Sequence, residues 1–180
     1  MDIAVTGASG TIGTARTEAL AARGDRVLRL VRRTPGTDEI GWDPADGTID
    51  RSGLEGLDAV VHIGAAGIGS HRWTDDYKRE IRDSRVEGTA LIARTLAGLQ
   101  TPPSVFVSQS AIAVYGDQGD HVLTEDSPSG SGFLAEVVVD WEKAAEPARE
   151  AGLRVVHPRT GQVLSPVPDL GLTNIFFGEG

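Results

Sequence analysis

Short apolar runs alternate along the chain with longer segments in which apolar residues recur at helical spacing. The apolar runs predict strands at 2–6, 26–31, 39–42, 58–63, 104–109 and 153–157, the third of them short. The helical spacing predicts helices at 11–23, 74–98 and 133–151. Strands that alternate with helices predict an α/β fold, a Rossmann-like doubly wound parallel sheet with right-handed crossovers.

The turn between the first predicted strand and helix carries the clearest functional signal. Gly7, Gly10 and Gly13 follow the strand directly, and the helix begins among them. A strand, Gly-rich turn and helix in this order bind the pyrophosphate of a dinucleotide, because the helix N-terminus offers unpaired N–H groups and partial positive charge. The turn therefore supplies these candidate cofactor residues: Gly7, Ser9, Gly10, Thr11, Ile12 and Gly13.

Two arginines follow the second predicted strand, where NAD-binding proteins place an acidic residue on the ribose 2′-hydroxyl. The forked donors of Arg32 and Arg33 suit a 2′-phosphate, so the expected cofactor is NADP(H). The alternative is a pair of solvated surface arginines. The hydroxyl of Ser9 could add a donor to the same phosphate, or Ser9 could serve only as a turn residue.

Small and hydroxyl-bearing residues follow two other predicted strands. Gly64 and Ala65 either leave room for the cofactor or form a tight turn. Ser108 and Ser110 lie at the next strand end, where hydroxyls face the cofactor cleft. We expect Ser110 to orient the reacting oxygen and Tyr115 to carry a proton. The alternatives are backbone capping by Ser110 and packing by Tyr115.

Basic residues surround the start of the long predicted helix. Arg82 and Arg85 are three positions apart and therefore neighbours on the helix surface. They could hold an anionic substrate, or they could form a solvated face with Asp83 and Glu87 as partners.

Composition and net charge limit the kinds of molecule that the chain is expected to bind. The 180 residues include 26 acidic and 17 basic side chains, a formal charge of −9, which disfavours nucleic acid and membrane surfaces. The chain has no cysteine, and its four histidines lack ligand spacing, so no metal is expected. No apolar run approaches the roughly 20 residues of a membrane span, and no signal peptide begins the chain, so we expect a cytoplasmic protein.

Several motifs in sequence order resemble the extended short-chain dehydrogenase/reductase superfamily. They are Thr6–Gly13, Arg72–Thr74, Ile81–Arg85, Ser108–Ala111, Tyr115–Asp117, Gly132–Glu136, Asp140–Glu142 and Arg159–Gly161. Within the superfamily, the chain is similar to epimerase-like proteins labelled nucleoside-diphosphate-sugar epimerase or cell-division inhibitor. The resemblance implies NADP(H) on the Gly turn, Arg32 near the 2′-phosphate, and Ser110 at the position of the catalytic Ser or Thr.

The chain departs from the superfamily pattern in three places. Phe133 and Val137 stand where the superfamily places the catalytic Tyr-x-x-x-Lys, and Gln109 replaces a small residue. Phe cannot donate a proton, and Val offers no cation. Full members run to about three hundred residues. We therefore expect a dinucleotide-binding domain at 1–165, with 166–180 an irregular tail or the start of a largely absent substrate lobe.

Two functions follow from these patterns. The first is an NADP(H)-dependent oxidoreductase or epimerase-like enzyme that acts by hydride transfer on a small polar substrate, with nucleotide sugars one candidate class. The second is an NADP(H)-binding sensor or regulatory module that has lost catalysis. A homodimer through the long helix or the helix after Phe133 is a candidate assembly.

Overall fold

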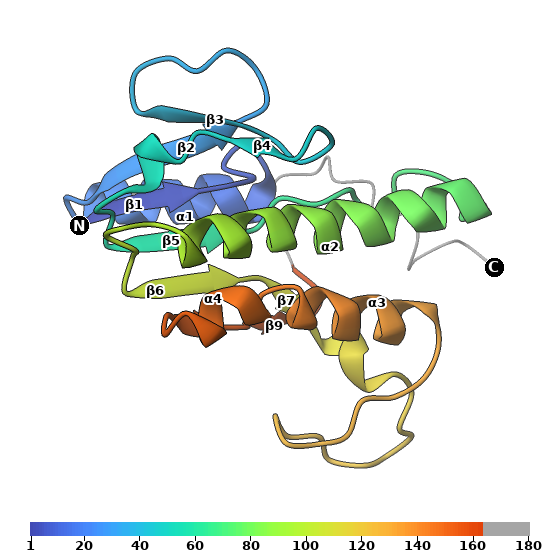
Figure 1. Ribbon diagram of the computed structural model, residues 1–180. Coiled ribbons are helices and arrows are strands. Elements are labelled where there is room, and N and C mark those ends of the chain that lie inside the picture. The colour runs from blue at the N-terminus through green and yellow to red at the C-terminus, as the bar shows by residue number, and fades with distance from the viewer. Residues whose placement is uncertain (164–180) are drawn as a thin grey trace.

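The computed structural model describes residues 1–163, which form a sheet with helices on both faces (Figure 1). The expected tail at 166–180 lies outside the described residues. The strands are β1 (Asp2–Val5), β2 (Arg26–Val31), β3 (Glu39–Asp43), β4 (Thr48–Ile49), β5 (Ala59–His62), β6 (Val105–Ser108), β7 (Ser110–Ala111), β8 (Arg154–Val156) and β9 (Arg159–Thr160). The helices are α1 (Thr11–Ala22), α2 (Asp75–Ala97), α3 (Phe133–Lys143) and α4 (Glu146–Glu150), with 3₁₀ turns η1 (Ser52–Leu54) and η2 (Ile112–Tyr115).

The main sheet has the order β4-β3-β2-β1-β5-β6-β8. All its neighbours are parallel except β4, which pairs antiparallel with β3 at the edge. The chain builds outward from β1 in one direction through β2 and β3, and then in the other through β5, β6 and β8. This confirms the Rossmann-like doubly wound sheet, and it places the switch point between β1 and β5, where such folds bind ligands.

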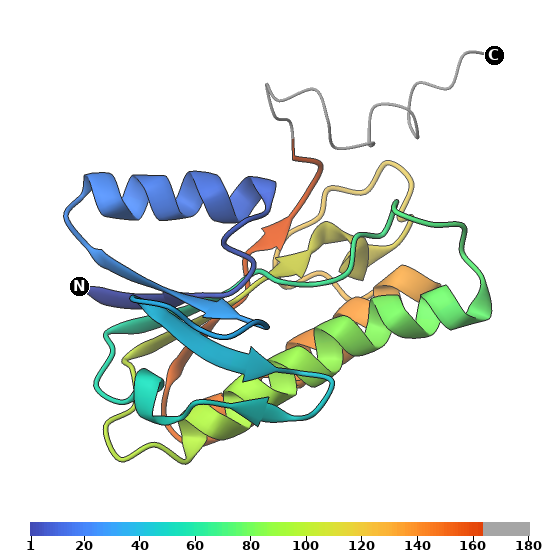
Figure 2. The ribbon, with the colours of Figure 1, turned by 90° about the horizontal axis from the view of Figure 1, so that it is seen from above.

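Figure 2 shows α1 on one face of the sheet and α2, α3 and α4 on the other. Residues 32–38 connect β2 to β3 without a helix. The larger core lies beneath α2 and includes Ile92 and Leu96, and Ile81 on the same predicted helical stripe is also fully buried. Full burial of each such side chain is worth about 1.5–3 kcal/mol. Within residues 1–163, no helix combines the length and hydropathy that a bilayer span requires.

The prediction of one helix at 133–151 was wrong, because α3 ends at Lys143 and α4 begins at Glu146. Pro147 explains the break. Its nitrogen has no hydrogen to donate, and its ring would clash with the carbonyl four residues earlier if the helix continued. At the first turn of α4 the same residue is well tolerated.

The sequence analysis also missed β4 and a second small sheet, in which β7 pairs parallel with β9. Each of these strands has two residues, too few for any periodicity to appear. The small sheet sets Ser110 opposite Arg159. It therefore determines the surroundings of the predicted catalytic serine.

Candidate functional site

The Gly turn leaves the N-terminus of α1 without a side-chain cap. Gly7 takes a left-handed φ of +63°, and the N–H of Gly10 donates to its carbonyl at 3.0 Å. Gly10 precedes the first helical residue, and the first helical hydrogen bond runs from Thr14 to its carbonyl. The backbone N–H groups at the start of α1 are therefore free to meet an anion.

The three glycines have different reasons to be glycine. A Cβ on Gly13 would lie 2.0 Å from the carbonyl oxygen of Gly7, and one on Gly7 would lie 2.9 Å from Gly64 Cα. Both glycines, and the small Gly64, therefore allow close backbone packing. A Cβ on Gly10 would meet only the Gly7 oxygen at 3.5 Å, an ordinary contact. The fold does not require glycine at position 10, whereas a phosphate at the turn would.

A buried polar contact joins β1 to β5 directly beneath the turn. Thr6 Oγ1 accepts hydrogen bonds from the backbone N–H groups of Ile63 and Gly64, at 2.9 and 3.0 Å. It lies 2.7 Å from Nδ1 of His62, to which it donates its own hydrogen. Burial lowers the pKa of His62 to about 4, so the ring is neutral at physiological pH. Sequence reasoning missed this pair, although a Thr and a His end two neighbouring apolar strands.

A groove of about 1170 Å³ opens at the switch point, between the Gly turn, the ends of β2 and β5, and α2. Seven of the predicted cofactor residues line it: Gly7, Ser9, Gly10, Arg32, Arg33, Gly64 and Ala65. Thr11 and Ile12 begin α1 beside it, and Gly13 is buried behind the turn. Ser108 is fully buried and does not line the groove.

The structure distinguishes the two arginines, which the residue pattern after the second strand does not separate. Arg33 makes a bidentate ion pair with Glu39 at 2.8 and 2.6 Å. This hydrogen bonding raises the pKa of Arg33 and lowers that of Glu39, which also accepts the N–H of Gly36. Arg33 therefore closes the 32–38 loop. Arg32 is exposed and makes no ion pair within the described part of the chain.

Asp38, the first acidic residue after these arginines in the sequence, lies away from the groove. Asp38 pairs with Arg26, the first residue of β2, at 2.7 Å, at the opposite end of that strand from the Gly turn. It therefore lies away from the groove, whereas Glu39, which lines the groove, is held by Arg33.

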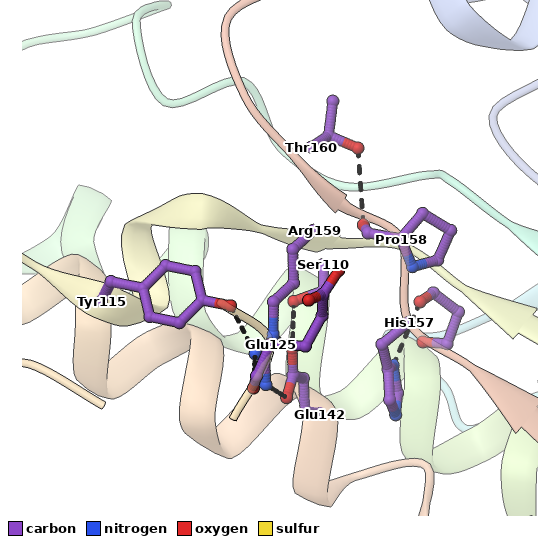
Figure 3. A network of polar contacts seen from close by, with 9 residues as sticks. Ser110, Tyr115, Glu125, Glu142, His157, Pro158, Arg159 and Thr160 are labelled. Atoms are coloured by element: carbon purple, nitrogen blue, oxygen red, sulfur yellow. Dashed lines mark hydrogen bonds and ion pairs between the residues drawn. The ribbon is translucent and has the colours of Figure 1, made fainter. Parts of the chain in front are cut away.

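The two predicted catalytic residues meet in a polar network (Figure 3). Ser110 donates to Glu142 Oε1 at 2.5 Å, and Arg159 donates to both oxygens of Glu142 at 2.9 and 3.0 Å. Arg159 also donates to the hydroxyl of Tyr115 at 2.7 Å, with its guanidinium 5.2 Å from that ring. Glu142 and Arg159 link Ser110 to Tyr115, and sequence reasoning had noted both residues only as parts of motifs.

Hydrogen bonds within the network stabilise the charged forms of Glu142 and Arg159. Burial opposes ionisation of Glu142, but hydrogen bonds from Arg159 and Ser110 outweigh it and hold its pKa below the usual value. The hydrogen bond to Glu142 raises the pKa of Arg159. Tyr115, Glu142 and Arg159 line a second cavity of about 750 Å³, which shares no lining residue with the groove. Ser110 is fully buried and lines neither space.

The position of the missing Tyr-x-x-x-Lys is occupied by an aromatic cluster. Phe133 lies edge-to-face with Trp73, with ring centroids 5.5 Å apart, and the ammonium of Lys78 is 5.6 Å from the Phe133 ring. Arg82, a candidate for holding an anionic substrate, forms an ion pair with Asp140 at 2.8 Å instead. Among residues 1–163, no three carboxylate or imidazole groups converge as a metal site would require.

Comparison with known proteins finds relatives that match nearly the whole of this chain and that carry epimerase names. Epimerase family protein Mb2239 of Mycobacterium bovis is 41% identical over 165 residues, which is 91% of this chain and 54% of that protein. A crystal structure of a nucleoside-diphosphate sugar epimerase from Corynebacterium glutamicum is 39% identical, with a TM-score of 0.84, over 100% of this chain and 38% of that one.

A human relative has been solved with a cofactor. The crystal structure of human epimerase family protein SDR39U1 with NADPH is 33% identical, with a TM-score of 0.83, over 98% of this chain and 59% of that one. The chain thus spans about half the length of the curated relatives it matches. Residues 3–174 match the NAD dependent epimerase/dehydratase family, and the chain belongs to that family.

Proposed function

We propose that this chain binds NADP(H) in the groove at the switch point. The observation that carries the proposal is the pairing of an uncapped helix N-terminus with an exposed arginine that lacks an ion-pair partner among residues 1–163. The turn around Gly10 would receive the pyrophosphate, and Arg32 would bind the 2′-phosphate. The human relative solved with NADPH supports this choice of cofactor.

We propose further that the chain supplies the cofactor-binding half of an oxidoreductase or epimerase-like enzyme. When bound, the nicotinamide would accept or donate hydride at its C4 position. The substrate would be small and polar, and the relative named as a nucleoside-diphosphate sugar epimerase makes nucleotide sugars a candidate class. The protein's own groups would fix the cofactor and orient the substrate oxygen.

Calorimetric titration with NADPH and NADH tests the cofactor assignment. An Arg32→Gln variant should bind NADPH about 10- to 100-fold more weakly, because charge-assisted hydrogen bonds contribute about 1.5–3 kcal/mol. Its NADH affinity should be unchanged, since NADH has no 2′-phosphate. An Arg33→Gln variant is the matched control, with a smaller effect because Glu39 already holds Arg33. Equal binding of both cofactors by the parent chain would disprove NADP(H) selectivity.

Ser110 and Tyr115 stay the proposed catalytic residues, with Ser110 orienting the reacting oxygen. In the structure the Ser110 hydroxyl donates to Glu142, so it must turn away from that carboxylate to donate to a substrate. A Ser110→Ala variant should lose tenfold or more in turnover, an effect of about 1.4 kcal/mol or more, with unchanged NADPH affinity. Unchanged turnover in a full-length enzyme carrying this substitution would remove Ser110 from the mechanism.

A sensor or regulatory module is the second candidate function. Phe133 and Val137 favour it, because neither side chain can transfer a proton at the position of the superfamily's Tyr and Lys. NADPH oxidation with any member of a carbonyl panel would establish the enzyme. Tight NADPH binding without turnover, together with a cofactor-dependent partner, would establish the sensor.

A further inference from the structure

Arg85 is a cation without a carboxylate partner in the described chain. It projects from α2, and its guanidinium carbon lies 5.3 Å from the ring centroid of Trp141 on α3. One of its N–H groups donates to the carbonyl of Ile81 in its own helix at 2.8 Å. Within residues 1–163, no Asp or Glu lies within ion-pair distance of it.

Arg82, about one turn earlier on the same helix, does have carboxylate partners. Arg82 pairs with Asp140 at 2.8 Å and with Asp83 at 3.5 Å. Both arginines lie beside α3, yet carboxylates neutralise only the more exposed one. The absence of a carboxylate partner for Arg85 therefore contrasts with the pairing of Arg82.

Burying a cation in this way opposes folding. Burial lowers the pKa of Arg85, although a guanidinium stays protonated at any physiological pH. Its remaining N–H donors have no acceptor among the described residues, and none of its unpaired nitrogens is fully enclosed. An apolar side chain of similar length would pack on Trp141 without this desolvation cost, since isolated buried charges are unfavourable. The cation–π contact with Trp141 and the hydrogen bond to Ile81 offset part of this cost, but they do not use all of the guanidinium's donors.

The guanidinium lies at the ligand-binding end of the sheet. Gly88, three residues further along α2, is opposite His62, the last residue of β5, with its Cβ position 3.7 Å from that ring. The Arg85 side chain bends back toward Ile81 and the start of α2, so it lies beyond the carboxyl end of β5.

Arg85 is not itself a lining residue of the groove, but its neighbour in the chain is. Ser84 accepts the backbone N–H of Ala66 at 3.1 Å, and both residues line the groove. Arg32 follows β2 on one side of β1, and Arg85 lies against α3 on the β5–β6 side. A dinucleotide extends across such a switch point, so the two arginines flank opposite halves of it.

We propose that Arg85 is the anion-binding residue of the substrate site and that the substrate carries a carboxylate. This inference rests on the proposed function, because it needs the reacting half of the cofactor on the β5–β6 side. A carboxylate suits the site because the Arg85 guanidinium, 5.3 Å from the Trp141 ring centroid, keeps N–H donors that no described residue accepts, and a carboxylate can accept two of them. The nearest cation along α2, Arg82, is already neutralised by Asp140.

Two methionine variants and an acetate titration test the proposal. Sodium acetate, compared with sodium chloride at equal ionic strength, should raise the melting temperature of the parent chain in a saturable manner. Arg85→Met should abolish this shift, and Arg82→Met should retain it. Without acetate, Arg85→Met should melt at or above the parent temperature, because it removes an uncompensated charge. A merely structural arginine would show the opposite result.

An Arg85→Lys variant keeps the charge but lacks the fork, and its apparent acetate affinity should fall about tenfold. The proposal is overturned if acetate gives the parent no shift beyond chloride, if Arg85→Met keeps the shift, or if Arg85→Met melts well below the parent. NADPH titration of Arg85→Met should match the parent. If the parent chain does not bind NADPH, the cofactor assignment is wrong. The acetate titration then tests anion binding by Arg85 independently of the cofactor.

Discussion

Replacing Gly13 with alanine should remove about 3 kcal/mol or more of folding free energy, whereas replacing Gly10 with valine should leave the fold intact and abolish NADPH binding. A Cβ on Gly13 would lie 2.0 Å from the Gly7 carbonyl oxygen and 2.8 Å from Ala8 Cα, so α1 would have to move away from the sheet. Both obstructing atoms are backbone, which cannot rotate aside. Urea unfolding of the two variants measures the difference.

Gly10 is the matched control because it lies in the same turn, is exposed, and has only one ordinary contact at its Cβ position. Its valine side chain would occupy the space in which a pyrophosphate approaches the main chain. A Gly10→Val chain that still binds NADPH would show that the phosphates do not lie on this turn. A Gly13→Ala chain as stable as the parent would contradict the close packing of α1 on β1.

Acidification should destabilise the chain through His62 before most carboxylates titrate. Its pKa is lowered from 6.5 to about 4 by burial. As the pH falls below 6.5, the unfolded chain therefore takes up a proton that the folded chain refuses. The stability present above pH 6.5 is lost progressively toward pH 4, by about 3 kcal/mol in total at 1.36 kcal/mol per unit.

Urea unfolding at pH 7 and pH 5 measures this loss, which should reach about 2 kcal/mol at the lower value. His62→Asn is the control, because its amide oxygen can still accept the hydroxyl hydrogen of Thr6 but does not titrate. Burial also lowers the pKa of His157, which titrates in both chains and cancels in the comparison. An equal loss of stability in the two chains would show that His62 is not the group responsible.

Patterns of several residues predicted most of the fold. The runs that end near Val31, His62 and Ser108 form parallel strands, and the expected apolar stripe of α2 is buried. The Gly turn could be assigned because its chemistry lies within one short segment. The failed helix prediction also had a visible signal, since Pro147 stands inside the predicted range. Two-residue strands such as β7 and β9 have no pattern that a sequence can reveal.

The polar site was harder to predict because its partners are distant in sequence. Ser110 was expected at the end of the strand that precedes it, whereas it begins the separate strand β7, and its partner Glu142 lies on α3, 32 residues away in sequence. The roles of neighbouring arginines depend in the same way on whether a carboxylate happens to face them. Glu39 binds Arg33 and leaves Arg32 free of an ion pair in the described chain, a distinction invisible in the string Arg-Arg.

The Arg159 side chain joins parts of the chain that would otherwise open separately. It contacts Glu142 on α3, Tyr115 in η2 and the carbonyl of Glu125 in the loop that follows, while its own strand pairs with β7. Breaking any one contact exposes charge that the others must compensate. The loop, η2 and the end of α3 should therefore gain and lose protection from hydrogen exchange as one cooperative unit, independent of the Gly turn.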